Sequence, residues 1–512
     1  MGSRRQHKRV AKMQSRLIIA AIFVLLQLAV FTAVAYFFAA RKFWVYTLLE
    51  AISIIIVIYI LANKGNPSYK LTWIIYILIF PIVGGLAYLV WGGGRVFPYI
   101  KRRMITYSRG SRKYLKQDRN VKNRLVYDDL IHARQATFLT ATSGFPVYDG
   151  TKTDYLSPGE RAFPVILEDL KKAEKYIFIE FFIIADGSMW EEIFAILKEK
   201  VAKGVEVRVI FDDFGSITKQ YRHFKRRLEE AGILVQVFNR IHASLDIFQN
   251  NRNHRKIIVV DGKVAFTGGM NISDEYINRV ERFGYWMDCA LRLEGKAVAS
   301  FVVMFLSMWG FCTGRPQRFN RYITDYSLKA NGFVQPYCDG PINNQNPGEG
   351  IYMQLLNTAQ KYVYIATPYL IVDNTMTKEL TLAASSGIDV RILVPKIPDK
   401  TYVHPVTQYS YDELLAAGVR IFEYSPGFIH SKFFVSDDSV ATVGTVNMDY
   451  RSFFFHFECG AWLCRTDSVK EIKKHFLQMQ KQSEEIILEK WRKRPLKLRF
   501  KQAILNLFAP FM

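Results

Sequence analysis

The sequence predicts apolar helices at the N-terminus followed by two homologous α/β halves that together form one catalytic unit. Three observations predict this fold class. Long apolar runs occupy most of the first 100 residues. An 18-residue window that begins at His254 recurs at His430, with 8 identical positions. The apolar segments before each copy also match, so the part of the chain after the apolar runs is interpreted as a duplicated unit with a pseudo-twofold arrangement.

The first 100 residues predict an N-terminal membrane domain with helical spans at about 17–40, 43–62 and 71–91. Each run has roughly the 20 apolar residues that a helix needs to cross a bilayer. Glu50 interrupts the second run, and its carboxylate is expected to reach the interface. Basic residues flank both ends of this block. Three spans would place the two basic clusters on opposite sides of the membrane, so a run that lies in the interface or re-enters is an open alternative.

The composition indicates a polyanionic partner. The net charge is +23, from 69 lysines and arginines against 46 acidic residues. A membrane surface and a nucleic acid are the two candidate polyanions. Residues 101–135 form a basic connector, which is either a solvated face or a contact with anionic headgroups. The five cysteines are scattered without zinc-ligand spacing, which argues against a disulfide framework and favours a reducing compartment.

Residues 136–325 and 326–490 form the two predicted halves. Each half runs strand, helix, strand, helix, strand and then a hairpin that contains the repeated window. For example, GVEVRVIFD at 204–212 corresponds to GIDVRILVP at 387–395. Apolar strands that alternate with amphipathic helices, such as 189–202, predict α/β sheets that are covered by helices.

Residues 491–512 place cations first and leucine, phenylalanine and alanine after them. The segment is too short and too charged to span a membrane. It predicts a basic amphipathic tail at the membrane interface, and a terminal helix packed on the catalytic halves is the alternative.

The repeated window has the pattern H-x-K-x(4)-D-x(6)-G-x(2)-N in both copies. Strand, tight turn and strand follow one another, so the histidine and the lysine two residues later point to the same face. The lysine supplies a compact positive charge, and the imidazole attacks or moves a proton, which suits chemistry on an anion. Two such pairs across one site would serve a phosphate diester without a metal.

The candidate catalytic residues are His254, Lys256, Asp261, His430, Lys432 and Asp437. The two aspartates among them are expected to fix the turn rather than to transfer protons.

These paired motifs resemble the HKD motifs of the phospholipase D superfamily, and the chain from about residue 45 onward is similar to bacterial cardiolipin synthases. The segment at 66–92 resembles the N-terminal membrane segment of that family. The family often has Gly-Ser after the aspartate, whereas this chain has Gly268-Gly269 and Gly444-Thr445, the second of which keeps a hydroxyl. The resemblance implies N-terminal transmembrane helices followed by an α/β phospholipase D fold.

Four further residues are candidates for the site. Asn271 and Asn447 each lie 17 residues after their histidine. They are expected to donate hydrogen bonds to phosphate oxygens, with turn capping as the alternative. Asp288 and Glu458 lie among aromatic residues, and a buried carboxylate needs a partner. The resemblance implies that these two acids orient the histidines.

The resemblance implies a membrane-bound cardiolipin synthase that uses no cofactor and no metal. One histidine, taken as His254, would attack the phosphorus of phosphatidylglycerol, and His430 would protonate the leaving glycerol. A second phosphatidylglycerol would then accept the phosphatidyl group. The near symmetry of the halves leaves open which histidine is the nucleophile.

The implied partners are phosphatidylglycerol and anionic membrane lipids, and not nucleic acid. The implied location is the cell membrane, multi-pass, with the catalytic part facing the cytoplasm. A phospholipase D that uses water as acceptor would need the same residues. The apolar runs argue against a nuclease of the same superfamily, and a non-enzymatic scaffold would predict decay of at least one motif.

Overall fold

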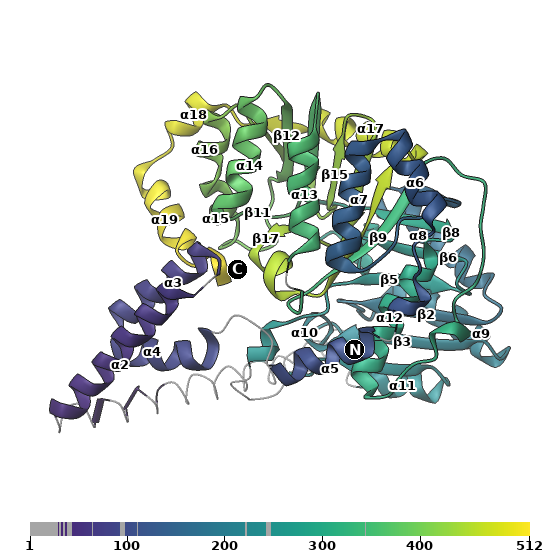
Figure 1. The fold of residues 1–512 in the computed structure, drawn as a ribbon, viewed down its shortest axis with the longest axis horizontal. Coiled ribbons are helices and arrows are strands. Elements are labelled where there is room, and N and C mark those ends of the chain that lie inside the picture. Colours follow the sequence, from purple (N-terminus) through teal and green to yellow (C-terminus); the bar gives the residue numbers. More distant parts are fainter. Residues whose placement is uncertain are drawn as a thin grey trace, which may run out of the picture.

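The structure is a computed structural model, and it describes residues 29, 32–33, 36–37, 43–63, 65–92, 98–109, 111–220, 223–241, 247–343 and 345–511. The predicted span at 17–40 lies almost entirely outside the described residues. Two sheet-containing halves lie side by side, helices α2 to α4 project from one side, and the C-terminal end lies beside α3 (Figure 1). The predicted architecture of two α/β halves is confirmed.

The N-terminal helices are α2 (Phe43–Ala62), α3 (Pro67–Ile79) and α4 (Pro81–Ala87), followed by a π-helical turn, η1 (Tyr88–Gly92). The third apolar run therefore differs from the single span expected at 71–91. It breaks at Phe80, because a residue before proline is disfavoured in the helical conformation and Phe80 precedes Pro81. Within the described residues, no helix has the combined length and apolar character that the predicted spans require.

The connector region folds into helices. These are α5 (Pro98–Arg109), η2 (Arg112–Tyr114), α6 (Arg119–Asp128) and α7 (Leu130–Ser143). Asp118 and Asp129 cap α6 and α7 by accepting hydrogen bonds from backbone N–H groups of the first turn. The buried apolar side chains of α6 and α7 belong to the apolar cluster of the second sheet, although both helices precede the first sheet in the chain.

The first sheet has seven strands in the order β1-β8-β6-β5-β2-β3-β4. They are β1 (Thr151–Leu156), β2 (Tyr176–Phe181), β3 (Glu206–Asp212), β4 (Leu234–Phe238), β5 (Lys256–Val260), β6 (Val264–Gly268) and β8 (Ala290–Gly295). Its outer face is covered by α8 (Gly159–Lys171), α9 (Ser188–Ala202) and α11 (Phe224–Glu230). Strands β2, β3 and β4 are parallel, and the strands that contain the motif are antiparallel to their neighbours.

The second sheet repeats this order as β9-β18-β16-β15-β10-β12-β13 and adds β19 (Ser483–Glu485) at one edge. Its other strands are β9 (Phe333–Asp339), β10 (Tyr362–Ala366), β12 (Asp389–Pro395), β13 (Arg420–Tyr424), β15 (Phe433–Ser436), β16 (Val440–Gly444) and β18 (Glu458–Cys464). The helices on its outer face include α13 (Pro347–Thr358), α14 (Asn374–Ser385) and α16 (Tyr411–Ala416).

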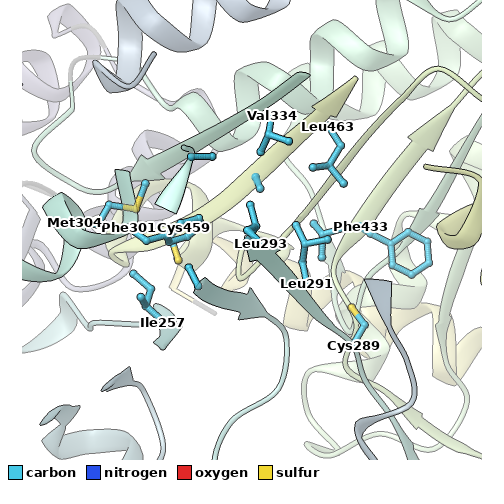
Figure 2. Packing of buried hydrophobic residues seen from close by; sticks show 14 of the residues in the cluster. Ile257, Cys289, Leu291, Leu293, Phe301, Met304, Val334, Phe433, Cys459 and Leu463 are labelled. Atoms are coloured by element: carbon cyan, nitrogen blue, oxygen red, sulfur yellow. The ribbon is translucent and has the colours of Figure 1, made fainter. Parts of the chain in front are cut away.

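One continuous apolar core joins the halves. It contains strands of both sheets together with α12 (Val298–Thr313) and α17 (Asp467–Lys481). Figure 2 shows Ile257 and Leu293 of the first half with Cys459 and Leu463 of the second. Helix α12 is apolar over nearly its whole surface because it is buried within this core. The halves are therefore packed as one unit on either side of the seam between them.

Candidate active site

Both repeated histidines lie at the seam between the two halves. His254 stands two residues before Lys256, the first residue of β5, and His430 directly follows the short strand β14 (Gly427–Ile429). The histidines are 7% and 8% exposed, and Lys256 and Lys432 are each 1% exposed. The ammonium group of Lys256 donates a hydrogen bond to the backbone oxygen of His254 at 2.7 Å, and Lys432 donates to that of His430. Each pair thus places one imidazole beside one buried cation.

The acid that holds each histidine comes from the other half. Nδ1 of His254 lies 2.9 and 3.0 Å from the two carboxylate oxygens of Glu458, and Nδ1 of His430 lies 2.7 Å from Oδ2 of Asp288. Both acids are 0% exposed. An Nδ1–H that donates to a carboxylate leaves a lone pair on Nε2, which is the form needed for nucleophilic attack or proton uptake.

Backbone hydrogen bonds also hold each histidine against the other half. The N–H of His254 donates to the backbone oxygen of Phe457 at 2.9 Å, and the N–H of His430 donates to that of Met287 at 2.8 Å. Strand β14 pairs in parallel with β7 (Tyr285–Met287) of the first half. Neither histidine would be held in place by its own half alone.

The two positions where the motif departs from the common Gly-Ser pair have different surroundings. The hydroxyl of Thr445 donates to Glu458, which also accepts a hydrogen bond from Ser452 Oγ at 2.9 Å. A Cβ at Gly269 would lie 2.1 Å from Oδ1 of Asp288, so this position has no room for a side chain. The residue types at positions 269 and 445 therefore differ because the backbone at Gly269 lies against the carboxylate of Asp288, whereas Thr445 reaches Glu458 through its side-chain hydroxyl.

Burial and nearby charge set the protonation of the site. Burial, together with the cation of Lys432, lowers the pKa of His430 to about 4, and burial lowers the pKa of His254 well below its usual value, with Lys256 acting in the same direction. Both imidazoles are neutral near pH 7. Burial also lowers the pKa of Lys256 to about 7 and that of Lys432 to about 8, although the acids of the site oppose this. An anion that binds between them would favour the charged form of both lysines.

The two motif aspartates lie at the turns, as expected. The carboxylate of Asp261 accepts hydrogen bonds from the backbone N–H groups of residues 174, 175 and 176, each at 2.8 Å. Asp437 does the same for residues 360, 361 and 362. Both aspartates have positive φ angles, +53° and +52°. Their hydrogen bonds connect the hairpin to the strand beside it, and the structure gives them no contact with the imidazoles.

The two motif asparagines use their amide groups for hydrogen bonds within the protein. Asn271 donates from Nδ2 to the hydroxyl of Tyr276 at 2.8 Å. Asn447 donates from Nδ2 to Asp449 at 3.0 Å, while its buried Oδ1 has no hydrogen-bond partner in the described part of the chain. Contact with a phosphate oxygen stays a prediction for both.

Sequence reasoning missed His456. It lies two residues before Glu458, as Trp286 lies two residues before Asp288, and its ring centre is 5.5 Å from that of His254. The Trp286 ring is likewise 5.5 Å from that of His430. Both ring nitrogens of His456 are buried without a hydrogen-bond partner among the described residues. An imidazole can donate one hydrogen bond and accept another, and His456 uses neither within the described part of the chain. Aligning the two acids of the repeat would have pointed to this position.

His254, His456 and Glu458 form the group of described residues whose ligand atoms lie close enough to hold a metal ion, all within 4.8 Å of one another. Charge opposes this use. Lys256 and Arg451 both act electrostatically on His456 as cations, and a divalent cation would be repelled by them. The same charges suit an anion. Two neutral imidazoles with free Nε2 atoms and two buried ammonium groups can bind a phosphodiester, attack its phosphorus and move one proton.

The chain matches the family described as "Cardiolipin synthase, PLD-like domain" at residues 166–309 and 352–480, and the family described as "Phospholipase_D-nuclease N-terminal" at residues 51–93. It is 40% identical to an uncharacterised protein of Streptococcus mutans serotype c, over 89% of this chain and 99% of that one. It is 34% identical to a cardiolipin synthase of Geobacillus sp. (strain WCH70), over 94% and 98%. It is 35% identical to cardiolipin synthase 2 of Bacillus anthracis, over 88% of each chain.

A solved structure shares the fold. The phosphatidylserine synthase of Haemophilus influenzae Rd KW20 matches with a TM-score of 0.55 at 14% identity, over 74% of this chain and 97% of that one. At this identity the likeness concerns the fold alone.

Proposed function

The chain belongs to the cardiolipin synthase family of phospholipase D-like proteins, and from that premise we propose that it transfers a phosphatidyl group from one phosphatidylglycerol to the terminal hydroxyl of another. The products are cardiolipin and glycerol. One observation carries the proposal, namely the crossed pairs in which His254 is held by Glu458 and His430 by Asp288, each beside a buried lysine. This is a phosphatidyltransferase site with two imidazoles that can divide attack and proton transfer between them.

In the first step, Nε2 of His254 attacks the phosphorus and the bond from phosphorus to the glycerol oxygen breaks. His430 gives its proton to that oxygen, and glycerol leaves. His430 must carry the proton at this point. The pKa of about 4 applies to the free site, and the negative charge of a bound phosphodiester raises it. The carboxylate of Asp288 stabilises the imidazolium in the same way.

In the second step, the terminal hydroxyl of another phosphatidylglycerol gives its proton to His430 and attacks the phosphorus. The bond from phosphorus to Nε2 of His254 then breaks and cardiolipin is released. Lys256 and Lys432 stabilise the negative charge on the phosphate oxygens in both transition states. We assign Asn271 and Asn447 to the same oxygens, after their amides turn away from Tyr276 and Asp449.

The working location in this proposal is the cell membrane, with the catalytic halves on the cytoplasmic side. The support is an apolar surface on α2 and α3 that is too large for an isolated water-facing helix pair. Its exposed side chains are Leu48, Ile54, Ile55, Ile58, Leu61, Leu71, Leu78 and Ile79. Helix α19 (Leu496–Asn506) also exposes Leu496 and Phe500, in keeping with a tail at the membrane interface.

A product assay tests the function. Purified full-length protein is incubated with phosphatidylglycerol in mixed micelles, and the lipids and free glycerol are quantified by mass spectrometry. We expect one glycerol for each cardiolipin, and no product from the His254→Ala and His430→Ala variants. Phosphatidic acid as the only lipid product would show that water is the acceptor and that the protein hydrolyses its substrate.

A further inference from the structure

A cavity of about 560 Å³ lies between α3, the π-helical turn η6 (Arg451–Phe455) and the C-terminal end. Its walls are aromatic and aliphatic, and include Trp73, Tyr76, Phe80, Phe455, Phe508 and Phe511. Its volume falls within the roughly 300–1,000 Å³ that small-molecule sites occupy. Contacts between the walls hold it open, because Phe511 packs edge-on against Tyr69 and Trp73, and Thr72 donates a hydrogen bond to the backbone oxygen of Leu507 at 3.0 Å.

Asn250 lines the cavity as well, and Arg451 is the charged residue among those that line it. Its side-chain hydrogen bond among the described residues is donated by Nη2 to the backbone oxygen of Phe511 at 3.1 Å. No carboxylate of the described chain forms an ion pair with it, and burial lowers the pKa of the group. Asp449 acts on this half-buried cation electrostatically without forming an ion pair with it, so a bound anion would stabilise it further. The combination fits a ligand with an apolar chain and an anionic group at one end.

The turn η6 connects the cavity to the site along the chain. Phe455 lines the cavity, and the next residue, His456, faces His254. The N–H of His456 donates to the backbone oxygen of Arg451 at 2.8 Å, which closes the turn. One turn of chain therefore contains two residues that line the cavity, Arg451 and Phe455, and ends at a residue whose ring lies beside that of His254.

We propose that this cavity binds one acyl chain of a phosphatidylglycerol substrate and that Arg451 contacts the anionic head of the same lipid. The inference rests on the proposed function and adds where the lipid is held. It gives the N-terminal helices and the C-terminal end a joint role, since α3 forms one wall and Phe508 and Phe511 form another. The exposed apolar face of α3 outside the cavity would continue into the bilayer from which the lipid comes.

Chain-length selectivity tests the proposal. Ile75 lines the cavity, whereas Leu78 lies on the same helix, is 68% exposed and does not. Cardiolipin formation by full-length wild type, Ile75→Trp and Leu78→Trp is measured with dioctanoyl- and dioleoyl-phosphatidylglycerol, with thermal unfolding as the control for folding. We expect Ile75→Trp to raise KM for the dioleoyl lipid about tenfold, or ~1.4 kcal/mol, to change KM for the dioctanoyl lipid much less, and to leave kcat unchanged. Leu78→Trp should match wild type.

Two outcomes separate this inference from the proposed function. If wild type makes no cardiolipin from either lipid, the proposed function fails. If wild type is active and Ile75→Trp behaves like Leu78→Trp, or affects both lipids equally, the cavity does not bind the acyl chain.

A phosphatidylglycerol with a diazirine on one acyl chain identifies the occupant directly. After irradiation of the full-length protein in mixed micelles, we expect labelled peptides from α3 and from residues 507–511, and loss of this label in Ile75→Trp. Arg451→Gln should raise KM for both lipids, because the anionic head is common to them, and Arg451→Lys should recover part of the loss. Labelling confined to α2 would overturn the proposal.

Discussion

The crossed pairing of acids and histidines makes the sharpest prediction. Glu458→Gln replaces one of the two carboxyl oxygens that hold His254, at distances of 2.9 and 3.0 Å and with no exposure to solvent. A buried donor that loses its acceptor costs about 1–3 kcal/mol, which corresponds to roughly a 5- to 150-fold loss in kcat/KM. The amide can also donate to Nδ1 and so favour the wrong tautomer, which acts in the same direction. Asp288→Asn should lower kcat/KM by a similar factor, because Asp288 holds His430.

The pairing itself is tested by double-mutant cycles. Free energies of unfolding are measured by urea titration in detergent for Glu458→Gln, His254→Asn, His430→Asn and the two double variants. The crossed pair of Glu458 and His254 should show a coupling energy of about 1.5–3 kcal/mol, whereas Glu458 and His430, which share no hydrogen bond, should be additive within about 0.5 kcal/mol. Coupling of Glu458 to His430 in place of His254 would refute the crossed arrangement.

Three further predictions concern single residues. His430 has a folded pKa of about 4 against about 6.5 when unfolded, so the unfolded state binds more protons between these pH values. Stability should therefore fall as the pH is lowered from 6.5 to 4, by up to ~1.4 kcal/mol per pH unit from this group. Urea unfolding at several pH values measures this slope, and an unchanged slope in His430→Asn would contradict the assignment. Asp261→Ala removes the acceptor of three backbone N–H groups and should cost about 2–3 kcal/mol of stability while KM stays unchanged, and a raised KM with wild-type stability would place Asp261 in the site. His456→Phe should lower kcat/KM about tenfold with no change in melting temperature, with partial recovery in His456→Asn; equal activity in the phenylalanine variant would mean that the imidazole does not contact substrate.

Much of the fold followed from local patterns. The alternation of apolar strands with amphipathic helices predicted two α/β halves, and the sheets repeat one strand order around the two hairpins. Asp261 and Asp437 lie at tight turns with positive φ, where a short polar side chain can accept backbone hydrogen bonds. The family resemblance drawn from the paired motifs is confirmed by the family match over both halves. The break at Phe80 was also present in the sequence, since a proline follows it, but the apolar run obscured it.

Other features depended on contacts between distant parts of the chain. The packing of α6 and α7 on the second sheet joins segments that the order of the halves would separate. The acyl-chain cavity needs α3 and the last residues of the chain side by side. The role of Arg451 depends on which carboxylates come near it, and spacing along the chain carries no information about that.

The sequence by itself identified the candidate site residues, because two histidines and two lysines recur at matching places in a duplicated unit and an acid follows each copy. It left open which acid serves which histidine. Asp288 follows His254 by 34 residues and Glu458 follows His430 by 28, so both are near a histidine in the chain, yet each binds the histidine of the other half. The tertiary structure decided this, because β14 pairs with β7 and His254 binds the backbone of Phe457 across the seam. Such long-range strand contacts depend on how the completed halves pack, and no local pattern encodes them.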